Sequence, residues 1–337
     1  MNDLFLQAAS EWQFLFTVNI LVAILAAICS IALKKFGRGE KVNVRILGIF
    51  HPHCDSGGGG ERVLWVMIHA LLKEDLFKES LKIVIYAAKG DKHKKQMLSA
   101  VKDSFGLDVT EQSERITFVP ISSTALLEAK WYPVATMLFQ SLASILVGLE
   151  CLIRCAPDIY CDTMGAAFIY PLAKVLFGCV VVTYTHYPII SSDMLQRVRE
   201  QRPAHNNDSI ISSSVSISAA KLAYYQVFAY AYTIVGSFAD KVIVNSSWTE
   251  NHISQLWRLR KDQREERIRQ DSTKNSMDYE SRQGSGQKCT KSLIKMYPPC
   301  NTAHLQGIPL GDEKLRKRIV LSIGQFRPEK DHILQLR

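Results

Sequence analysis

The sequence predicts an α/β protein built on a doubly wound, mostly parallel sheet. Short runs rich in valine and isoleucine alternate with longer helical stretches along most of the 337 residues. Because continuous apolar runs of this kind are typical of strands buried on both faces, we expect helices to cover both sides of the sheet. A hydrophobic content of 47% is ample for the core of such a fold.

The strands and helices follow one another in the order that this fold class requires. The helical stretch at 61–74 places five large apolar side chains on one face, Leu64, Met67, Ile68, Leu71 and Leu72. Strands are predicted at 42–50, 81–88, 116–121, 158–163, 180–187, 240–246 and 318–324.

The first 40 residues contain a candidate membrane anchor. Residues 14–33 carry no charge and are long enough to cross a bilayer as a helix. Asp3 and Glu11 precede this run and Lys34 and Lys35 follow it, which is the reverse of a cleaved signal peptide. We therefore expect residues 1–13 to be a lumenal tail, 14–33 a single transmembrane helix, and the remainder cytosolic. The eight cysteines, with no CxxC pair, favour reduced thiols and agree with a reducing compartment.

A second apolar stretch, at 132–153, has one charged residue, Glu150, near its end. Its length would allow it to span a membrane. Gln140, Ser141 and Ser144 favour instead a buried or half-embedded helix, although a spanning helix remains the alternative.

The segment 258–296 differs in composition from the rest of the chain. It has 11 Lys/Arg against 6 Asp/Glu, a net of 11 − 6 = +5 out of the total +9, and Tyr279 is its one aromatic residue. This composition predicts a solvated, flexible insertion, and a nucleic-acid interface is the less favoured reading because stacking side chains are scarce. We expect no nucleic-acid partner.

Four consecutive glycines, Gly57 to Gly60, join the first predicted strand to the first long helix. Ligands bind beyond the carboxyl ends of parallel strands, and backbone N–H groups at a helix N-terminus attract phosphate oxygens. The stretch lacks the Gly-Lys-Ser/Thr of a P-loop and the GxGxxG of a dinucleotide site. It predicts a loop that a phosphate-bearing ligand approaches closely, with a purely structural turn as the alternative.

Two further segments contain groups that could act on such a ligand. His186 comes after the apolar run 179–183, near the end of the predicted strand, and it is either a cleft residue or a histidine satisfied by neighbouring backbone. The loop after the last predicted strand contains Arg327 and Lys330. These two cations suit a diphosphate, and a solvated turn is the alternative.

The order of these motifs resembles one known family. The stretches "FHPHCDSGGGGERVLW", "DTMGAAFIYPL", "THYPIISSDML", "DKVIVNSSWTENHI", "YPPC" and "LSIGQFRPEKDH" are together similar to the GDP-mannose-dependent retaining glycosyltransferases of the GT-B fold. Within that family they are most similar to the α-1,2-mannosyltransferases of asparagine-linked glycosylation. The resemblance covers the chain from the anchor to Arg337, except for the longer segment 258–296.

The resemblance implies two Rossmann-like domains facing each other across a cleft. Residues 42–300 would form the N-terminal, acceptor-binding domain, with 258–296 as an insertion in it. Residues 301–337 would begin a C-terminal, donor-binding domain, which this chain would only start, as in a C-terminally truncated product.

The resemblance also assigns roles to residues of the first domain. Gly57, Gly58, Gly59 and Gly60 would lie beside the donor diphosphate, and Glu61 and Arg62 would begin the helix behind them. His186 would be the catalytic residue beside the transferred mannose, with Tyr187 on the acceptor side of the cleft.

In the second domain, Lys330 matches the lysine that binds the donor diphosphate in the family. Gln325 stands where many relatives have arginine, so Arg327 is the residue expected to supply the second positive charge.

The implied reaction is transfer of mannose from GDP-mannose, with retained configuration, to a dolichol-diphosphate-linked oligosaccharide on the cytosolic face of the endoplasmic reticulum membrane. No metal and no cofactor are expected, because helix N-termini and basic side chains take over the negative charge of the leaving group. Other mannosyltransferases of the same pathway are further expected partners. The alternatives are a lipid-linked transferase that forms α-1,3 or α-1,6 linkages, and a truncated, non-catalytic protein that binds membrane or acceptor.

Overall fold

The computed structural model describes residues 44–77, 80–191, 215–257 and 292–300, together with Met194, Thr302, Gln306, Ser322 and His332. The chain divides into two compact units, Met1–Ile189 with Tyr232–Pro298 and Ile190–Ala231 with Pro299–Arg337. The expected anchor at 14–33, residues 258–291 of the expected insertion and nearly all of the predicted strand at 318–324 lie outside the described residues.

The first unit contains one seven-stranded sheet, and every pairing in it is parallel. The strand order is β3-β2-β1-β4-β5-β6-β7, so β1 lies centrally between β2 and β4. The predicted α/β class with a parallel sheet is thereby confirmed. The strands are β1 (Arg45–Phe50), β2 (Leu81–Ala87), β3 (Ile116–Pro120), β4 (Ile159–Asp162), β5 (Val180–Thr185), β6 (Lys241–Val244) and β7 (Ser292–Lys295).

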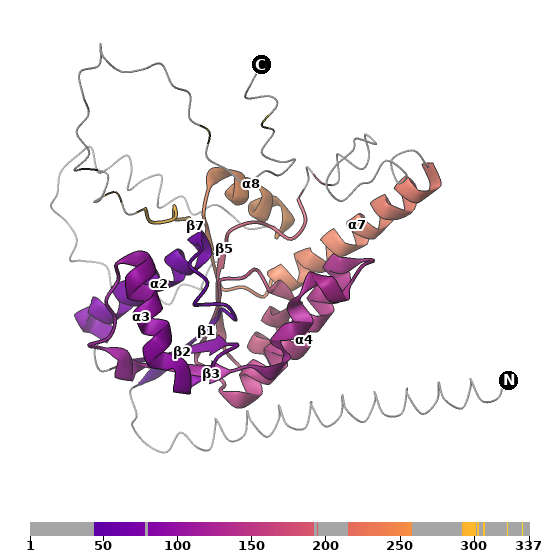
Figure 1. Ribbon diagram of the computed structural model, residues 1–337. Coiled ribbons are helices and arrows are strands. Elements are labelled where there is room, and N and C mark those ends of the chain that lie inside the picture. Colours follow the sequence, from indigo (N-terminus) through magenta and orange to yellow (C-terminus); the bar gives the residue numbers. More distant parts are fainter. Residues whose placement is uncertain are drawn as a thin grey trace, which may run out of the picture. The chain divides into compact units, whose positions relative to one another are not determined.

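Helices connect successive strands, with α2 and α3 on one face of the sheet and α4 on the other (Figure 1). The long helices are α2 (Gly59–Lys73), α3 (Lys94–Phe105), α4 (Thr136–Arg154), α7 (Val215–Gly236) and α8 (Ser247–Leu256). Short 3-10 helices lie at Asp75–Phe77, Asp91–His93, Ser113–Arg115, Ser122–Leu127, Ala129–Trp131 and Ala167–Ile169, and a π-helical turn lies at Leu172–Leu176.

Helix α2 forms where the apolar spacing predicts it, and its inner face packs on the sheet. Leu64, Ile68 and Leu72 are buried, as are Val63 and Trp65. The predicted face members Met67 and Leu71 are partly buried at the rim of the same core. An acidic residue in the first turn and Lys73 in the last turn both suit the helix dipole.

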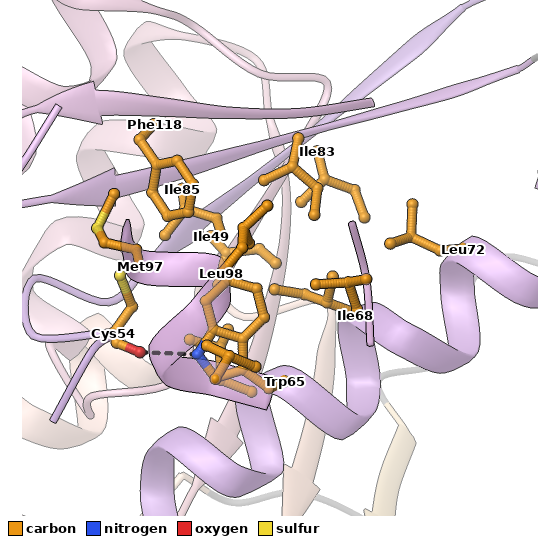
Figure 2. Packing of buried hydrophobic residues seen from close by; sticks show 14 of the residues in the cluster. Ile49, Cys54, Trp65, Ile68, Leu72, Ile83, Ile85, Met97, Leu98 and Phe118 are labelled. Atoms are coloured by element: carbon orange, nitrogen blue, oxygen red, sulfur yellow. Dashed lines mark hydrogen bonds between the residues drawn. The ribbon is translucent and has the colours of Figure 1, made fainter. Parts of the chain in front are cut away.

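The core between α2, α3 and the sheet is built from aliphatic side chains around one indole ring (Figure 2). Ile49 of β1 and Ile83 and Ile85 of β2 are fully buried beneath Trp65. The Trp65 Nε1 atom donates a hydrogen bond of 2.7 Å to the carbonyl of Cys54, in the loop that follows β1. This bond ties the loop to the core, so the loop's position is fixed by the same packing that forms the sheet.

Helix α4 corresponds to the apolar stretch at 132–153, and one side of it is buried in the first unit. Val147, Cys151 and Leu152 are buried, and a Cβ on Gly148 would lie 2.6 Å from Cγ2 of Ile169, so the two segments touch through a glycine. The helix begins only at Thr136, because Pro133 and the left-handed Ala135 (φ 50°) precede it. Within the described residues, α4 is the one helix long and apolar enough to cross a membrane.

The opposite side of α4 is apolar and exposed. Phe139, Leu142, Leu146 and Ile153 are between 44% and 59% exposed, and Trp131 and Val134 just before the helix are 61% and 76% exposed. We refer to these six residues as the α4 apolar face. The buried side agrees with a half-embedded helix more closely than with one surrounded by lipid.

The expected flexible insertion at 258–296 ends earlier than its composition indicates. Ser292–Lys295 form β7, which pairs in parallel with β6 and adds a strand to the same sheet. Leu293 is buried, and Lys295 lies 3.4 Å from Glu250 of α8. Four residues directly behind a charged run give too little alternation to be recognised as a strand, and their partner strand decides their conformation.

Candidate functional site

The candidate site lies at the carboxyl edge of the sheet, where β1 and β4 are neighbours. Connections leave β1 toward β2 and β3 on one side, whereas β4 begins the half of the sheet that runs to β7. A reversal of strand order of this kind opens a crevice between the loops after the two central strands. His51 follows β1 directly and Thr163 follows β4 directly.

The loop from His51 to Gly58 is held by hydrogen bonds along its first half. His51 N donates to Tyr86 O (3.3 Å), and Ala88 N donates to Pro52 O (2.9 Å), so the loop follows the end of β2. Lys89 Nζ reaches Asp55 Oδ2 at 2.6 Å. Together with the Trp65 bond to Cys54, these contacts fix where the four glycines begin.

The four glycines form the expected strand-to-helix turn, but they differ from one another in what they require. Gly57 has φ +52°, the left-handed conformation that favours glycine. Gly58 is the N-cap of α2 and has no side chain to cap the first turn, and Gly59 and Gly60 already belong to the helix. A Cβ on Gly59 would meet no protein atom within 4 Å. The backbone conformation thus explains Gly57, whereas nothing in the described protein requires glycine at 59.

Glu61, in the first turn of α2, joins a group of side chains that sequence reasoning does not bring together. His51 is 1% exposed, and its Nε2 atom lies 3.3 Å from Glu61 Oε1. Its Nδ1 atom lies 2.7 Å from Thr163 Oγ1, and Thr163 Oγ1 lies 3.1 Å from Phe50 O. His51 directly follows the predicted strand at 42–50, which is the one signal in the sequence that could have marked it, whereas Thr163 falls inside the predicted strand at 158–163.

His186 lies at the same edge, beyond the end of β5. A Cβ on Gly60 would lie 3.7 Å from its Nε2 atom, so the ring faces the first turn of α2. That Nε2 atom is buried and has no hydrogen-bond partner in the described part of the chain. Burial lowers the pKa of His186, and the negative charge of Glu61 acts in the opposite direction. A buried ring nitrogen without a hydrogen-bond partner among the described residues thus lies beside the N-terminus of α2.

Asp162, the last residue of β4, stabilises the loop after its strand and does not face the site. It is fully buried, accepts a hydrogen bond from Tyr170 Oη (2.6 Å), and accepts two more from the backbone N–H groups of Met164 and Gly165 (2.8 and 3.1 Å). Burial raises the pKa of this carboxyl, and the hydrogen bonds act against the shift.

Tyr187 and Trp248 form an exposed aromatic pair next to His186. Their ring centroids are 4.8 Å apart with the planes 21° from parallel. Trp248 belongs to the first turn of α8, whose N-cap Ser246 accepts a hydrogen bond from Thr249 N. Flat apolar rings at the rim of a polar site suit the faces of a sugar ring.

The other predicted site residues are not brought to this group by the described structure. The Arg62 guanidinium lies over the Phe105 ring of α3, with 5.9 Å from Cζ to the centroid. Arg327 and Lys330 lie outside the described residues. Within the described ranges, no group of three His, Cys, Asp or Glu side chains could hold a metal ion. That the reaction needs no metal stays a prediction.

The fold is that of an α/β protein with a parallel sheet, whose carboxyl edge brings a glycine-rich helix N-terminus close to a histidine. The sequence model described as "ALG11 mannosyltransferase N-terminus" matches residues 44–257. The chain belongs to this family, as the resemblance of its motifs predicts.

Curated relatives agree with this assignment. The chain is 39% identical over 293 residues to a protein of Xenopus tropicalis, covering 87% of this chain and 53% of the relative. It is 38% identical to a human protein (88% and 53%) and 36% identical to one of Dictyostelium discoideum (90% and 54%). All three are named GDP-Man:Man(3)GlcNAc(2)-PP-Dol alpha-1,2-mannosyltransferase.

The chain spans about half the length of the curated relatives it matches. Comparison with solved structures finds no match.

Proposed function

We propose that this chain serves the transfer of mannose from GDP-mannose, in α-1,2 linkage and with retention, to a dolichol-diphosphate-linked oligosaccharide. The observation that supports it most is the identity of 36–39% to relatives with this named activity, across about nine-tenths of the chain. The sheet described above would be the N-terminal half of a GT-B fold, and residues from 301 onward would belong to the donor-binding half.

The site geometry supports this reading in three ways. The bare N-terminal turn of α2 offers backbone N–H groups to a diphosphate. His186 Nε2 has no partner among the described residues and faces that turn, where a sugar hydroxyl on the diphosphate would lie. The Tyr187–Trp248 pair provides an apolar rim for acceptor sugars. Arg327 and Lys330 would complete the diphosphate site from the second half.

No metal takes part in this proposal. The α2 N-terminus and the two basic side chains would stabilise the GDP leaving group as its bond to mannose breaks. Transfer should therefore proceed unchanged in excess EDTA, and a loss of activity that Mn²⁺ or Mg²⁺ restores would contradict this part of the proposal.

We place the protein at the endoplasmic reticulum membrane, with the sheet and its site on the cytosolic side. The charge pattern around residues 14–33 and the α4 apolar face support this placement. A lipid-linked acceptor is confined to the membrane surface, so a site held beside that surface meets it at high local concentration. Other mannosyltransferases of the pathway would be its neighbours there.

A transfer assay tests the function directly. GDP-mannose with radiolabelled mannose and Man3GlcNAc2-diphosphate-dolichol are supplied to the 337-residue chain and to a chimera that joins residues 1–337 to the second half of the human relative. We expect product from the chimera that an α-1,2-mannosidase trims back to the acceptor. Product that resists this enzyme would indicate an α-1,3 or α-1,6 linkage instead. No product, where the intact human relative is active and the chimera is folded, would contradict the proposal.

A further inference from the structure

The carboxylate of Glu61 is held in place by a buried neighbour. His51 is 1% exposed, and its Nε2 atom lies 3.3 Å from Glu61 Oε1. On the other side of the ring, Nδ1 lies 2.7 Å from Thr163 Oγ1. A neutral ring with its proton on Nε2 satisfies both contacts, because it donates to the carboxylate and accepts from the Thr163 hydroxyl. Burial lowers the pKa of His51, which favours this neutral form. The ring thus ties Glu61 to the loop that follows β4.

The second carboxylate oxygen of Glu61, Oε2, is not used by the described protein. Oε1 takes the contact with His51, and no hydrogen bond joins Oε2 to any residue that the structure describes. The Glu61 side chain is 15% exposed, so Oε2 is the oxygen open to a ligand. A carboxylate held by one oxygen and free at the other is an acceptor whose position is set before a ligand binds.

Gly58, the N-cap of α2, leaves room for this carboxylate. A Cβ on Gly58 would lie 2.5 Å from Glu61 Oε2, closer than two such atoms can approach. The backbone of Gly58 is extended (φ −88°, ψ 179°), a conformation that other residues adopt readily. Serine or asparagine would also be favoured at an N-cap. The position of the carboxylate therefore gives this residue a reason to be glycine that the backbone does not give.

The chemistry of Oε2 favours a hydroxyl as its ligand. A carboxylate accepts hydrogen bonds from O–H groups and repels phosphate oxygens. His186 lies at the same turn of α2, and its buried Nε2 atom has no partner in the described part of the chain. Burial lowers the pKa of His186 and the charge of Glu61 acts against it, so the two side chains are close enough to interact. A few convergent polar groups of this kind orient a ligand with several hydroxyls.

We propose that Glu61 is a specificity residue of the transfer reaction, whose Oε2 atom accepts a hydrogen bond from a hydroxyl of a substrate sugar, and that His51 is its positioning residue. The inference rests on the proposed function, in which donor and acceptor both carry mannose. The donor diphosphate would meet the turn at Gly59, where a Cβ would find no protein atom within 4 Å. The carboxylate over Gly58 would meet the sugar.

Deoxy sugars test the hydrogen bond to Glu61, in the chimera described above. Loss of a hydrogen bond to a charged group should cost about 30-fold in kcat/KM. We expect Glu61→Ala to lower kcat/KM by this factor with the ordinary substrates, and no further when the bonded hydroxyl is missing from the sugar. Deoxy forms of GDP-mannose and acceptors with a deoxy mannose form the two arms, which show which substrate supplies the hydroxyl. Glu74→Ala, at the exposed C-terminal end of α2, is the matched control.

Two further variants move the carboxylate without removing it. His51→Ala frees Oε1, and Gly58→Ser places a Cβ against Oε2 while serine keeps the N-cap of α2. We expect each to lower kcat/KM about tenfold. His51→Gln, whose side-chain amide can still donate to Glu61, should stay within about threefold of the wild type. If His51 acts only through Glu61, adding His51→Ala to Glu61→Ala should have no further effect.

The outcomes separate this inference from the proposed function. If the wild-type chimera forms the α-1,2 product, and Glu61→Ala lowers kcat/KM equally for ordinary and deoxy forms of both substrates, the hydrogen bond is overturned and the proposed function stands. A double variant less active than Glu61→Ala would overturn the positioning role of His51. Gly58→Ser provides the same comparison with deoxy sugars if Glu61→Ala does not fold. A folded wild-type chimera that forms no product would contradict the proposed function and this inference with it.

Discussion

Among the single residues of the site, Gly57 and Gly59 have different reasons to be glycine. Gly57 adopts a left-handed conformation, which costs other residues about 1–2 kcal/mol. Gly59 is helical and a Cβ there meets no protein atom within 4 Å. In a helix, alanine is more favourable than glycine by about 1 kcal/mol. If Gly59 has a function, it is to let something other than protein approach.

Replacing each glycine by alanine distinguishes the requirement for a left-handed backbone at Gly57 from the approach of a ligand at Gly59. We expect Gly59→Ala to keep or raise the free energy of unfolding, by up to about 1 kcal/mol, while the KM for GDP-mannose rises about tenfold. Gly57→Ala should instead lower the free energy of unfolding by about 1 kcal/mol. Denaturant unfolding and transfer kinetics measure both. An unchanged KM in Gly59→Ala would mean that no ligand contacts this turn.

His186 should act on turnover and not on folding. Its ring packs edge-on against Tyr184 with 4.9 Å between centroids, and its Nε2 atom makes no hydrogen bond within the described structure that a substitution would break. We expect His186→Ala to lower kcat about 100-fold, a typical effect for a side chain that hydrogen-bonds the reacting group, with little change in Tm. His69→Ala, in the body of α2, is the control. A His186→Ala protein with normal turnover would rule out contact with the transferred sugar.

The sequence is sufficient to predict that Gly57–Gly60 lead from β1 into α2 and that His186 lies near the end of β5, because a glycine run and a valine-rich strand are visible in the sequence. That these residues bind a ligand stays a prediction. The Thr163–His51–Glu61 chain is not predictable in the same way. His51 and Thr163 are 112 positions apart, and their contact exists only because β4 crosses back to lie beside β1.

At the level of secondary-structure elements, Glu150 connects α4 to the segment before it. Its carboxylate accepts hydrogen bonds from the backbone N–H groups of Ser122 and Ser123, from the Ser123 hydroxyl and from Arg154. Burial raises the pKa of Glu150, but these hydrogen bonds outweigh it and bring the pKa to about 2. The ionised form therefore stabilises the fold.

This pKa predicts how stability depends on pH. Because the pKa is lowered from 4.5 in the unfolded chain to about 2, the contribution of Glu150 is fully present above about pH 5 and is lost as the pH falls toward 2. We expect Glu150→Gln to cost about 2 kcal/mol of unfolding free energy at pH 7 and much less near pH 2.5. Glu128→Gln, in an exposed ion pair with Lys130, should cost under about 1 kcal/mol. A pH-independent difference for Glu150→Gln would contradict this account.

Helices and strands were predictable from the sequence where their pattern of apolar residues is long. The periodic face of α2 and the valine-rich β5 are visible without any partner, but β7 depends on β6 for its conformation. The end of β5 at Thr185, two residues before the predicted end, also matters, because it moves His186 and Tyr187 off the strand and into the site.

At the scale of the whole molecule, the proposed orientation can be tested at the α4 apolar face. With Leu146→Cys in a Cys300→Ser background, a polarity-sensitive dye should shift to a shorter emission wavelength when the protein is placed in liposomes. Val180→Cys, at an exposed apolar residue outside that face, should show no shift. Equal spectra at both sites would mean that the α4 apolar face does not contact lipid.

Glycosylation provides an independent test of orientation. Asn207 and Asn245 both begin Asn-X-Ser sequences, and Asn245 is a partly buried residue directly after β6, where its side chain accepts a hydrogen bond from Ser246. A cytosolic domain never meets the lumenal glycosylation enzyme, so we expect both residues to be unmodified. Mass spectrometry of the intact protein would detect a glycan at either site, and such a glycan would reverse the assigned topology.

The length of strand β1 sets the distance between the site and the edge at which the chain enters the sheet. The chain enters it at Arg45 and leaves at Phe50, directly before His51. Six residues of parallel strand extend about 20 Å. The site therefore lies about 20 Å from the edge at which the chain enters the sheet. A lengthened linker before Arg45 would leave that interval unchanged, because the interval is set by the sheet.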